Sequence, residues 1–142
     1  MGKEAMFVLN CGHSAQSVLD IIRIWLDHEW NIYNSEGMAW YCDIGDDEGF
    51  YWKSAHIDMK ELTGIIAAKE LKNELVAVKL FDANDVGFTV LSRDTSEIII
   101  GLDYNRKTIS EGYTDVSWYY DAIIKLLIMN GCKPEHIEYS EL

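Results

Sequence analysis

The sequence predicts an α+β domain, in which an antiparallel-rich sheet carries about three helices packed on it. Three observations predict this class. Apolar residues recur at helical spacing in three stretches, strand-like apolar runs alternate with those stretches, and the runs at 75–81, 86–92 and 97–103 are joined by links of only four residues. Links this short allow only antiparallel neighbours, because a parallel pair needs a long crossover. The predicted order is β-α-β-β-α-β-β-β-α, within a single globular domain over residues 1–142.

The first strand and the first helix are predicted from periodicity. Residues 5–10 form an apolar run, and Ser14 is a suitable N-cap for the helix that follows. Apolar side chains then recur three and four positions apart and form one buried stripe, made of Val18, Ile21, Ile22, Trp25 and Leu26. We expect this helix to end near Trp30.

A β-hairpin is predicted over residues 38–56. Its strands cover 38–44 and 50–56, and the loop 45–49 carries three consecutive acids between two glycines. Because side chains alternate along a strand, we place Trp40 and Cys42 toward the core and Tyr41 and Asp43 toward solvent. The acids at the hairpin tip are expected to be solvated and to contribute little to stability.

The remaining helices carry clear end signals. Asp58 with Glu61 forms a capping box for a helix that runs to about residue 73. Thr114 or Asp115 caps the last helix, which ends before Gly131. Residues 136–139 are expected to form a short terminal strand.

Composition excludes several classes of function. The net charge of −12 at pH 7 disfavours nucleic acid and anionic membranes as partners, and no apolar run is long enough for a membrane span or a signal peptide. The three cysteines are odd in number and widely spaced, so reduced thiols in a cytoplasmic protein are expected.

The segment 24–52 carries the strongest functional signal. It holds seven acids, no Lys or Arg, and four of the five tryptophans. Carboxylates steer the encounter with a basic protein, and aromatic side chains supply rigid contact area once water is expelled. The expected partner-binding residues are Trp30, Tyr41, Asp43, Asp46, Asp47, Glu48 and Tyr51.

No enzyme motif competes with this signal. Cys11 and His13 are a close Cys-His pair, but the paired spacing of structural zinc ligands is absent, and so are the phosphate-binding glycine loops. The spacing of Asp46, Asp47 and Glu48 does not match an EF-hand. We therefore expect no catalysis, no metal and no cofactor. The alternative is a small enzyme or ligand-binding domain with a cleft near Cys11 and His13.

Three stretches carry a family resemblance: Glu97 to Asp103, then Asn105-Arg106-Lys107, then Gly112 to Tyr120. Together with the acidic, Trp-bearing hairpin before them, they resemble the small immunity proteins that bacteria carry against their own polymorphic or contact-dependent toxins. The proline-containing aromatic signature of the largest immunity superfamily is absent here. The resemblance implies a non-enzymatic protein that binds one cognate toxin domain, often a basic nuclease, and covers its active site. It supplies no catalytic residues to carry over.

Overall fold

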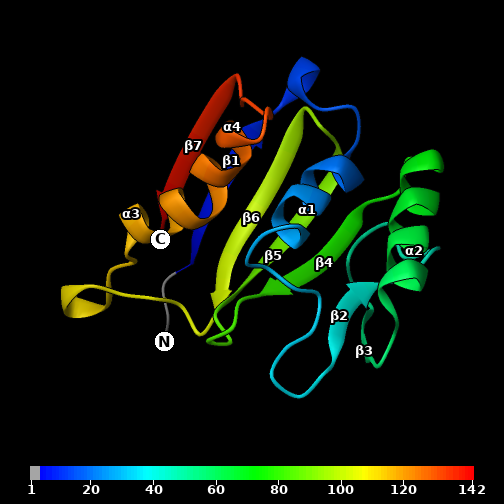
Figure 1. The fold of residues 1–142 in the computed structure, drawn as a ribbon, viewed down its shortest axis with the longest axis horizontal. Helices are drawn as coiled ribbons and strands as arrows, with labels where there is room; N and C mark the ends of the chain where they lie inside the picture. Colours follow the sequence, from blue (N-terminus) through cyan, green and yellow to red (C-terminus); the bar gives the residue numbers. More distant parts are fainter. Residues whose placement is uncertain (1–3) are drawn as a thin grey trace.

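The computed structural model describes residues 4–142, which form one seven-stranded antiparallel sheet with helices on one face (Figure 1). The spatial strand order is β3-β2-β4-β5-β6-β1-β7. The α+β class is therefore confirmed. The strands are β1 (Ala5–Asn10), β2 (Ala39–Cys42), β3 (Trp52–Ala55), β4 (Val76–Phe81), β5 (Gly87–Asp94), β6 (Glu97–Tyr104) and β7 (His136–Glu141). The helices are α1 (Val18–Leu26), α2 (Met59–Leu71) and a continuous one made of α3 (Val116–Tyr119), a π-helical segment (Tyr120–Lys125) and α4 (Leu126–Met129).

The two ends of the chain lie side by side in the sheet. β1 sits between β6 and β7, and Phe7 is the register partner of Ile100 on one side and Tyr139 on the other. The terminal strand predicted over 136–139 is confirmed and extends to Glu141. Short local links predicted the β4-β5-β6 meander, whereas the pairing of β1 with β6 and β7 joins segments far apart in sequence.

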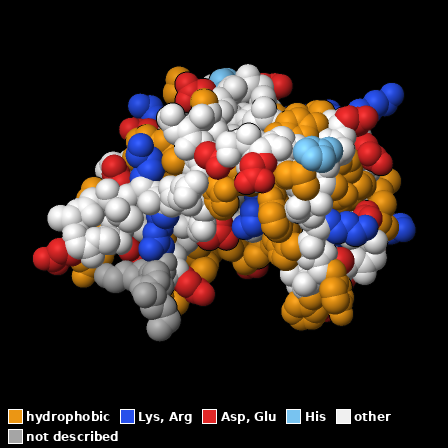
Figure 2. All heavy atoms as spheres, turned by 90° about the horizontal axis from the view of Figure 1, so that it is seen from below, with side chains coloured by type: hydrophobic (Ala, Val, Ile, Leu, Met, Phe, Trp, Pro, Cys, Tyr) orange, Lys and Arg blue, Asp and Glu red, His pale blue; other side chains and the backbone are white. Residues whose placement is uncertain are grey.

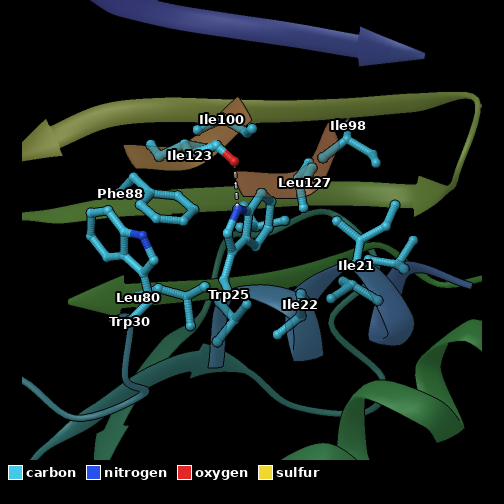
Figure 3. Packing of buried hydrophobic residues seen from close by; sticks show 14 of the residues in the cluster. Ile21, Ile22, Trp25, Trp30, Leu80, Phe88, Ile98, Ile100, Ile123 and Leu127 are labelled. Atoms are coloured by element: carbon cyan, nitrogen blue, oxygen red, sulfur yellow. Dashed lines mark hydrogen bonds between the residues drawn. The ribbon is translucent and has the colours of Figure 1, made fainter. Parts of the chain in front are cut away.

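The hydrophobic core fills the space between the sheet and the helices. Ile98, Ile100 and Leu102 alternate along β6 and are buried on the helix side, as are Phe88 and Val90 on β5. Figure 3 shows Trp25 of α1 among Phe88, Ile100, Ile123 and Leu127, so side chains from one helix, two strands and the last helix meet there. The predicted stripe of the first helix is confirmed at Val18, Ile21, Ile22 and Trp25, which are fully buried.

Two buried tryptophans hold the π-helical segment. The indole N–H of Trp25 donates to the carbonyl of Ile123 at 3.0 Å, and that of Trp30 donates to the carbonyl of Ala122 at 3.0 Å. Both rings also contact Phe88 edge-on, with centroids 5.1 and 4.6 Å away. A widened turn inside an α-helix disturbs its regular hydrogen bonding, and the two indoles supply donors to consecutive carbonyls at that point.

Replacing Trp25 with phenylalanine is expected to lower the free energy of unfolding by about 1–3 kcal/mol, because a buried hydrogen bond is lost and a small void remains. Denaturant titration measures the change. Trp40→Phe is the matched control, since Trp40 is half-buried on the other face of the sheet. Equal losses in the two variants would show that the indole bond of Trp25 does not stabilise the fold.

The N-terminus of α1 differs from the predicted one. Gly12–Ser14 forms a 3-10 turn, and Ser17 is the N-cap, with its hydroxyl accepting the amide of Asp20 at 3.0 Å. Two more amides of this terminus donate to the carboxylate of Glu70 on α2, at 2.9 and 2.8 Å. This cap comes from a distant helix, so local sequence could not place it. The Asp58 cap of α2 is confirmed, because its carboxylate accepts the amide of Glu61 at 2.7 Å.

Candidate functional site

The predicted hairpin forms, and Cys42 is buried as predicted, but Trp40 and Tyr41 are placed opposite to the prediction. Tyr41 pairs in register with Val78, and its side chain is only 7% exposed within the core. Trp40 lies on the opposite face and is half-buried. The expectation that Tyr41 projects into solvent is therefore wrong. A shift of one residue in a strand moves every side chain to the other face.

Trp30 was also expected to be exposed, and this expectation is wrong. Its side chain is 4% exposed and packs between Phe88 and Trp118. Its indole N–H is satisfied by the π-helical segment described above. Trp30 follows the end of α1 at Leu26, where the chain turns back across the core.

Two acids of the hairpin loop bind other groups of the protein, which the expectation of a solvated tip did not include. The Asp46 carboxylate accepts four consecutive backbone amides, from residues 48 to 51, at 2.7–3.3 Å. The Asp47 carboxylate accepts the amide of Leu75 at 2.9 Å and pairs with Arg93. Glu48 is exposed, and the side chain of Asp47 is 47% exposed. These bonds fix the loop on itself and on the neighbouring strands.

A buried lysine on α2 anchors the same loop. The side chain of Lys69 on α2 is 1% exposed, and its ammonium donates to the carbonyls of Asp43 and Asp46, both at 2.8 Å. The carboxylate of Glu74 lies 3.8 Å from that ammonium and accepts the amide of Gly45 at 2.8 Å. A buried ammonium is stable only when it is paired and hydrogen-bonded, so the loop conformation and the burial of Lys69 depend on each other.

The anchored loop presents two large aromatic side chains to solvent. Phe50 is 72% exposed and Tyr51 is 75% exposed. We call this pair the aromatic tip. Tyr51 was predicted as a contact residue, whereas Phe50 was missed, although its place after Gly49 in a turn-rich loop was a usable signal. Asp43 lies beside the tip, where its carboxylate pairs with Lys53 at 2.7 Å.

The face of the sheet opposite the helices is hollowed. Three adjoining hollows of about 470, 460 and 280 Å³ lie along it and share Leu91 in their lining. We call them together the open-face hollow. Its floor and walls are formed mainly by Met6, Trp40, Trp52, Leu75, Leu91, Ile99 and Gly101. Figure 2 shows a projection at the lower right margin of the molecule that ends in hydrophobic side chains.

A polar network crosses the middle of this hollow. The ammonium of Lys79 donates to the Thr89 hydroxyl at 2.7 Å and lies 3.3 Å from the Asp103 carboxylate, which accepts a hydrogen bond from the same hydroxyl at 2.8 Å. The Lys79 ammonium also lies 5.2 Å from the centroid of the Trp52 ring. The network joins one polar side chain from each of the strands β4, β5 and β6.

A second projection lies at the other end of the open face. The segment 105–114 leaves β6 at the lower left of Figure 1 and is closed by a bridge between Thr108 and Thr114. Glu111 and Gly112 turn the chain there with φ of +61° and +80°. Ile109 and Tyr113 are 56% and 48% exposed.

The loop carboxylates are held ionised in the folded state. The hydrogen bond from Lys53, then the amide of Ile44, lower the pKa of Asp43. Partial burial of Asp46 opposes ionisation, but the amide hydrogen bonds outweigh it and the pKa of Asp46 is lowered. The amide of Leu75, then Arg93, lower the pKa of Asp47.

These shifts predict acid sensitivity. Because the folded pKa values lie below the unfolded value of about 3.9, the stabilisation is present above that pH and is lost as the pH falls through the folded values. Urea midpoints of the wild type should therefore drop steeply below about pH 4. Asp46→Asn with Asp47→Asn should flatten this dependence, and an unchanged slope would contradict the assignment.

The Cys11–His13 alternative receives no support from the geometry. Cys11 is fully buried whereas His13 is exposed, and neither lines the open-face hollow. A hydrogen bond with Cys132, together with burial, raises the pKa of the Cys11 thiol far above its usual range, which disfavours the nucleophilic thiolate. Among the described residues, no three His, Cys, Asp or Glu side chains are grouped so that they could hold a metal ion. Within residues 4–142, no helix combines the length and hydropathy that crossing a membrane requires.

Comparison with protein-family models, curated proteins and solved structures found no match to this chain.

Proposed function

We propose that this protein is a non-enzymatic binding module that neutralises a basic partner protein. One observation carries the proposal: a loop fixed by Asp46 and by buried Lys69 exposes two adjacent aromatic side chains, Phe50 and Tyr51, that the fold does not use. Exposed aromatic side chains on a rigid support are typical binding anchors, since little conformational entropy is lost when they dock.

The charge of the molecule supports a basic partner. The net charge of −12 favours fast encounter with a positively charged surface and disfavours acidic competitors. Glu48 is exposed directly before the aromatic tip, so a carboxylate and two aromatic rings meet at one surface. Asp43 and Asp47 are offset by Lys53 and Arg93, so the negative field next to the tip comes chiefly from Glu48.

Within this class we propose a cognate toxin as the partner, with a basic nuclease as the leading candidate, whose active site this surface masks. The proposal combines the acidic surface with the resemblance to immunity proteins. The three buried free cysteines fit a reducing compartment, and we place the protein in the cytoplasm.

Capture from the native cell tests the proposal. The wild-type chain and the variant Phe50→Ala with Tyr51→Ala serve as matched baits, and bound proteins are identified by mass spectrometry. We expect one basic protein that the wild type retains and the variant loses, and whose enzymatic activity falls to zero at a 1:1 ratio of wild type. An activity that survives a stoichiometric excess of the wild type contradicts the proposal.

A further inference from the structure

We propose that the open-face hollow receives an amphipathic helix of the same basic partner, and that Gly101 keeps the floor of the hollow free for it. The identity of the partner rests on the proposed function above. The occupancy of the hollow is a separate claim, because the aromatic tip could bind the partner without it.

No close contact at Gly101 requires glycine, although the register of β5 with β6 shifts beside it, between Gly87 and Thr89. It lies in the interior of β6, between Met6 on β1 and Thr89 on β5, and it is not among the residues with positive φ. A Cβ added there would meet no atom closer than 3.7 Å, which is ordinary contact. Glycine weakens a strand interior and often marks a bulge or a place where another molecule or backbone approaches closely.

Gly87 on the neighbouring strand provides the contrast. A Cβ at Gly87 would lie 2.8 Å from a ring carbon of Phe81 and 3.0 Å from the carbonyl oxygen of Leu80. Packing therefore requires glycine at Gly87. No such contact explains Gly101, and its missing side chain leaves open space in the largest of the three hollows.

The chemistry of the hollow fits the apolar side of a helix. Met6, Leu91 and Ile99 are half-buried in its floor, with Trp40 and Trp52 at one end. Helices cover the opposite face of the sheet, so one layer of packing is present and this face lacks the other. The lining residues lie on six neighbouring strands, from Trp52 on β3 to Met6 on β1. At the usual strand spacing this is roughly 24 Å, which accommodates a helix about 10–12 Å wide.

The rim favours basic residues on the flanks of that helix. Five carboxylates line the three hollows against three cations. Lys79 and Arg93 are already paired with Asp103 and Asp47. The carboxylates are those of Glu4, Glu48, Asp94, Glu97 and Asp103.

Two readouts test the proposal in the full chain. A photo-crosslinking amino acid replaces Glu97 at the rim or, as the control, Arg23, which is exposed on α1. We expect the probe at 97 to join the partner that the wild type captures, through a peptide with apolar residues at helical spacing and flanking Lys or Arg. The probe at 23 should join it at least tenfold less. Separately, Gly101→Val should weaken partner binding at least tenfold while the melting temperature stays equal or rises, and Gly101→Ala should do so more mildly.

The outcomes separate this inference from the proposed function. If the partner binds Gly101→Val as tightly as wild type, while Phe50→Ala with Tyr51→Ala abolishes binding, the hollow is not occupied and the proposed function stands. A crosslinked peptide without basic residues or helical periodicity also overturns the inference. If Gly101→Val fails to fold, partner binding by Gly101→Ala and the crosslink from position 97 test the occupancy of the hollow instead. If the wild type captures no basic protein, the proposed function fails and this inference fails with it.

Discussion

Replacing Lys69 with methionine is expected to lower the free energy of unfolding by about 3–5 kcal/mol, the usual loss when one member of a buried charged cluster is removed. Methionine fills similar space but donates no hydrogen bond. The carbonyls of Asp43 and Asp46 then lose their donor, and the Glu74 carboxylate loses its nearest cation. Such unpaired buried groups carry most of the cost.

The effect should concentrate in the hairpin loop. Hydrogen exchange is expected to show loss of protection for amides 45–51, whereas the amides of β5 and β6 stay protected at moderate denaturant. Lys60→Met is the matched control, since Lys60 lies on the same helix and is exposed, and it should change stability by no more than about 0.5 kcal/mol. Equal losses in the two variants would contradict the anchoring role of Lys69.

The double variant Phe50→Ala with Tyr51→Ala is expected to weaken partner binding by about 2–4 kcal/mol, or roughly 30- to 1,000-fold, because truncated aromatic anchors carry most of a binding energy. Unfolding should change little, since both side chains are largely exposed. Met129→Ala is the control: Met129 is as exposed as Phe50 but lies at the end of α4. Dissociation rates from surface plasmon resonance measure the effect, and a loss of similar size in the control would contradict the role of the tip.

These two predictions are linked. If the loop binds because it is preorganised, Lys69→Met should weaken binding even though Phe50 and Tyr51 are intact. The Lys69→Met variant must then order, on binding, a loop that the wild type already holds in place. A Lys69→Met protein that remains folded and binds at wild-type affinity would show that the aromatic tip acts without the anchor.

The sequence predicted those elements whose signals are local. The capping residue Asp58, the short links between β4, β5 and β6, and the apolar stripe around Trp25 all specify structure through neighbours in the chain, and all are confirmed. The face of β2 was not predictable in this way. Trp40 and Tyr41 are both large and aromatic, so alternation alone could not decide which of them points to the core; the register with Val78 decides it.

The acids of the loop show a second kind of limit. Charge and spacing identified Asp46 and Asp47 as a conspicuous pair, but the groups that they bind are backbone amides and an arginine from a distant strand. The sequence does not show which backbone amides a carboxylate will bind. It also does not distinguish the buried Lys69 from an exposed lysine on the surface of a helix. The prediction of an acidic, aromatic binding segment stays a prediction. The proposed contact residues are now Phe50 and Tyr51, because Tyr41 is buried.

The most direct test of the central claim is a titration of the captured partner's activity with the wild type and with Phe50→Ala, Tyr51→Ala. We expect activity to fall linearly to zero at one equivalent of wild type, with a nanomolar or tighter dissociation constant. The double variant should require at least a thirtyfold excess for the same inhibition. Full activity in the presence of excess wild type, or equal inhibition by the double variant, would contradict the claim that this surface neutralises a basic partner.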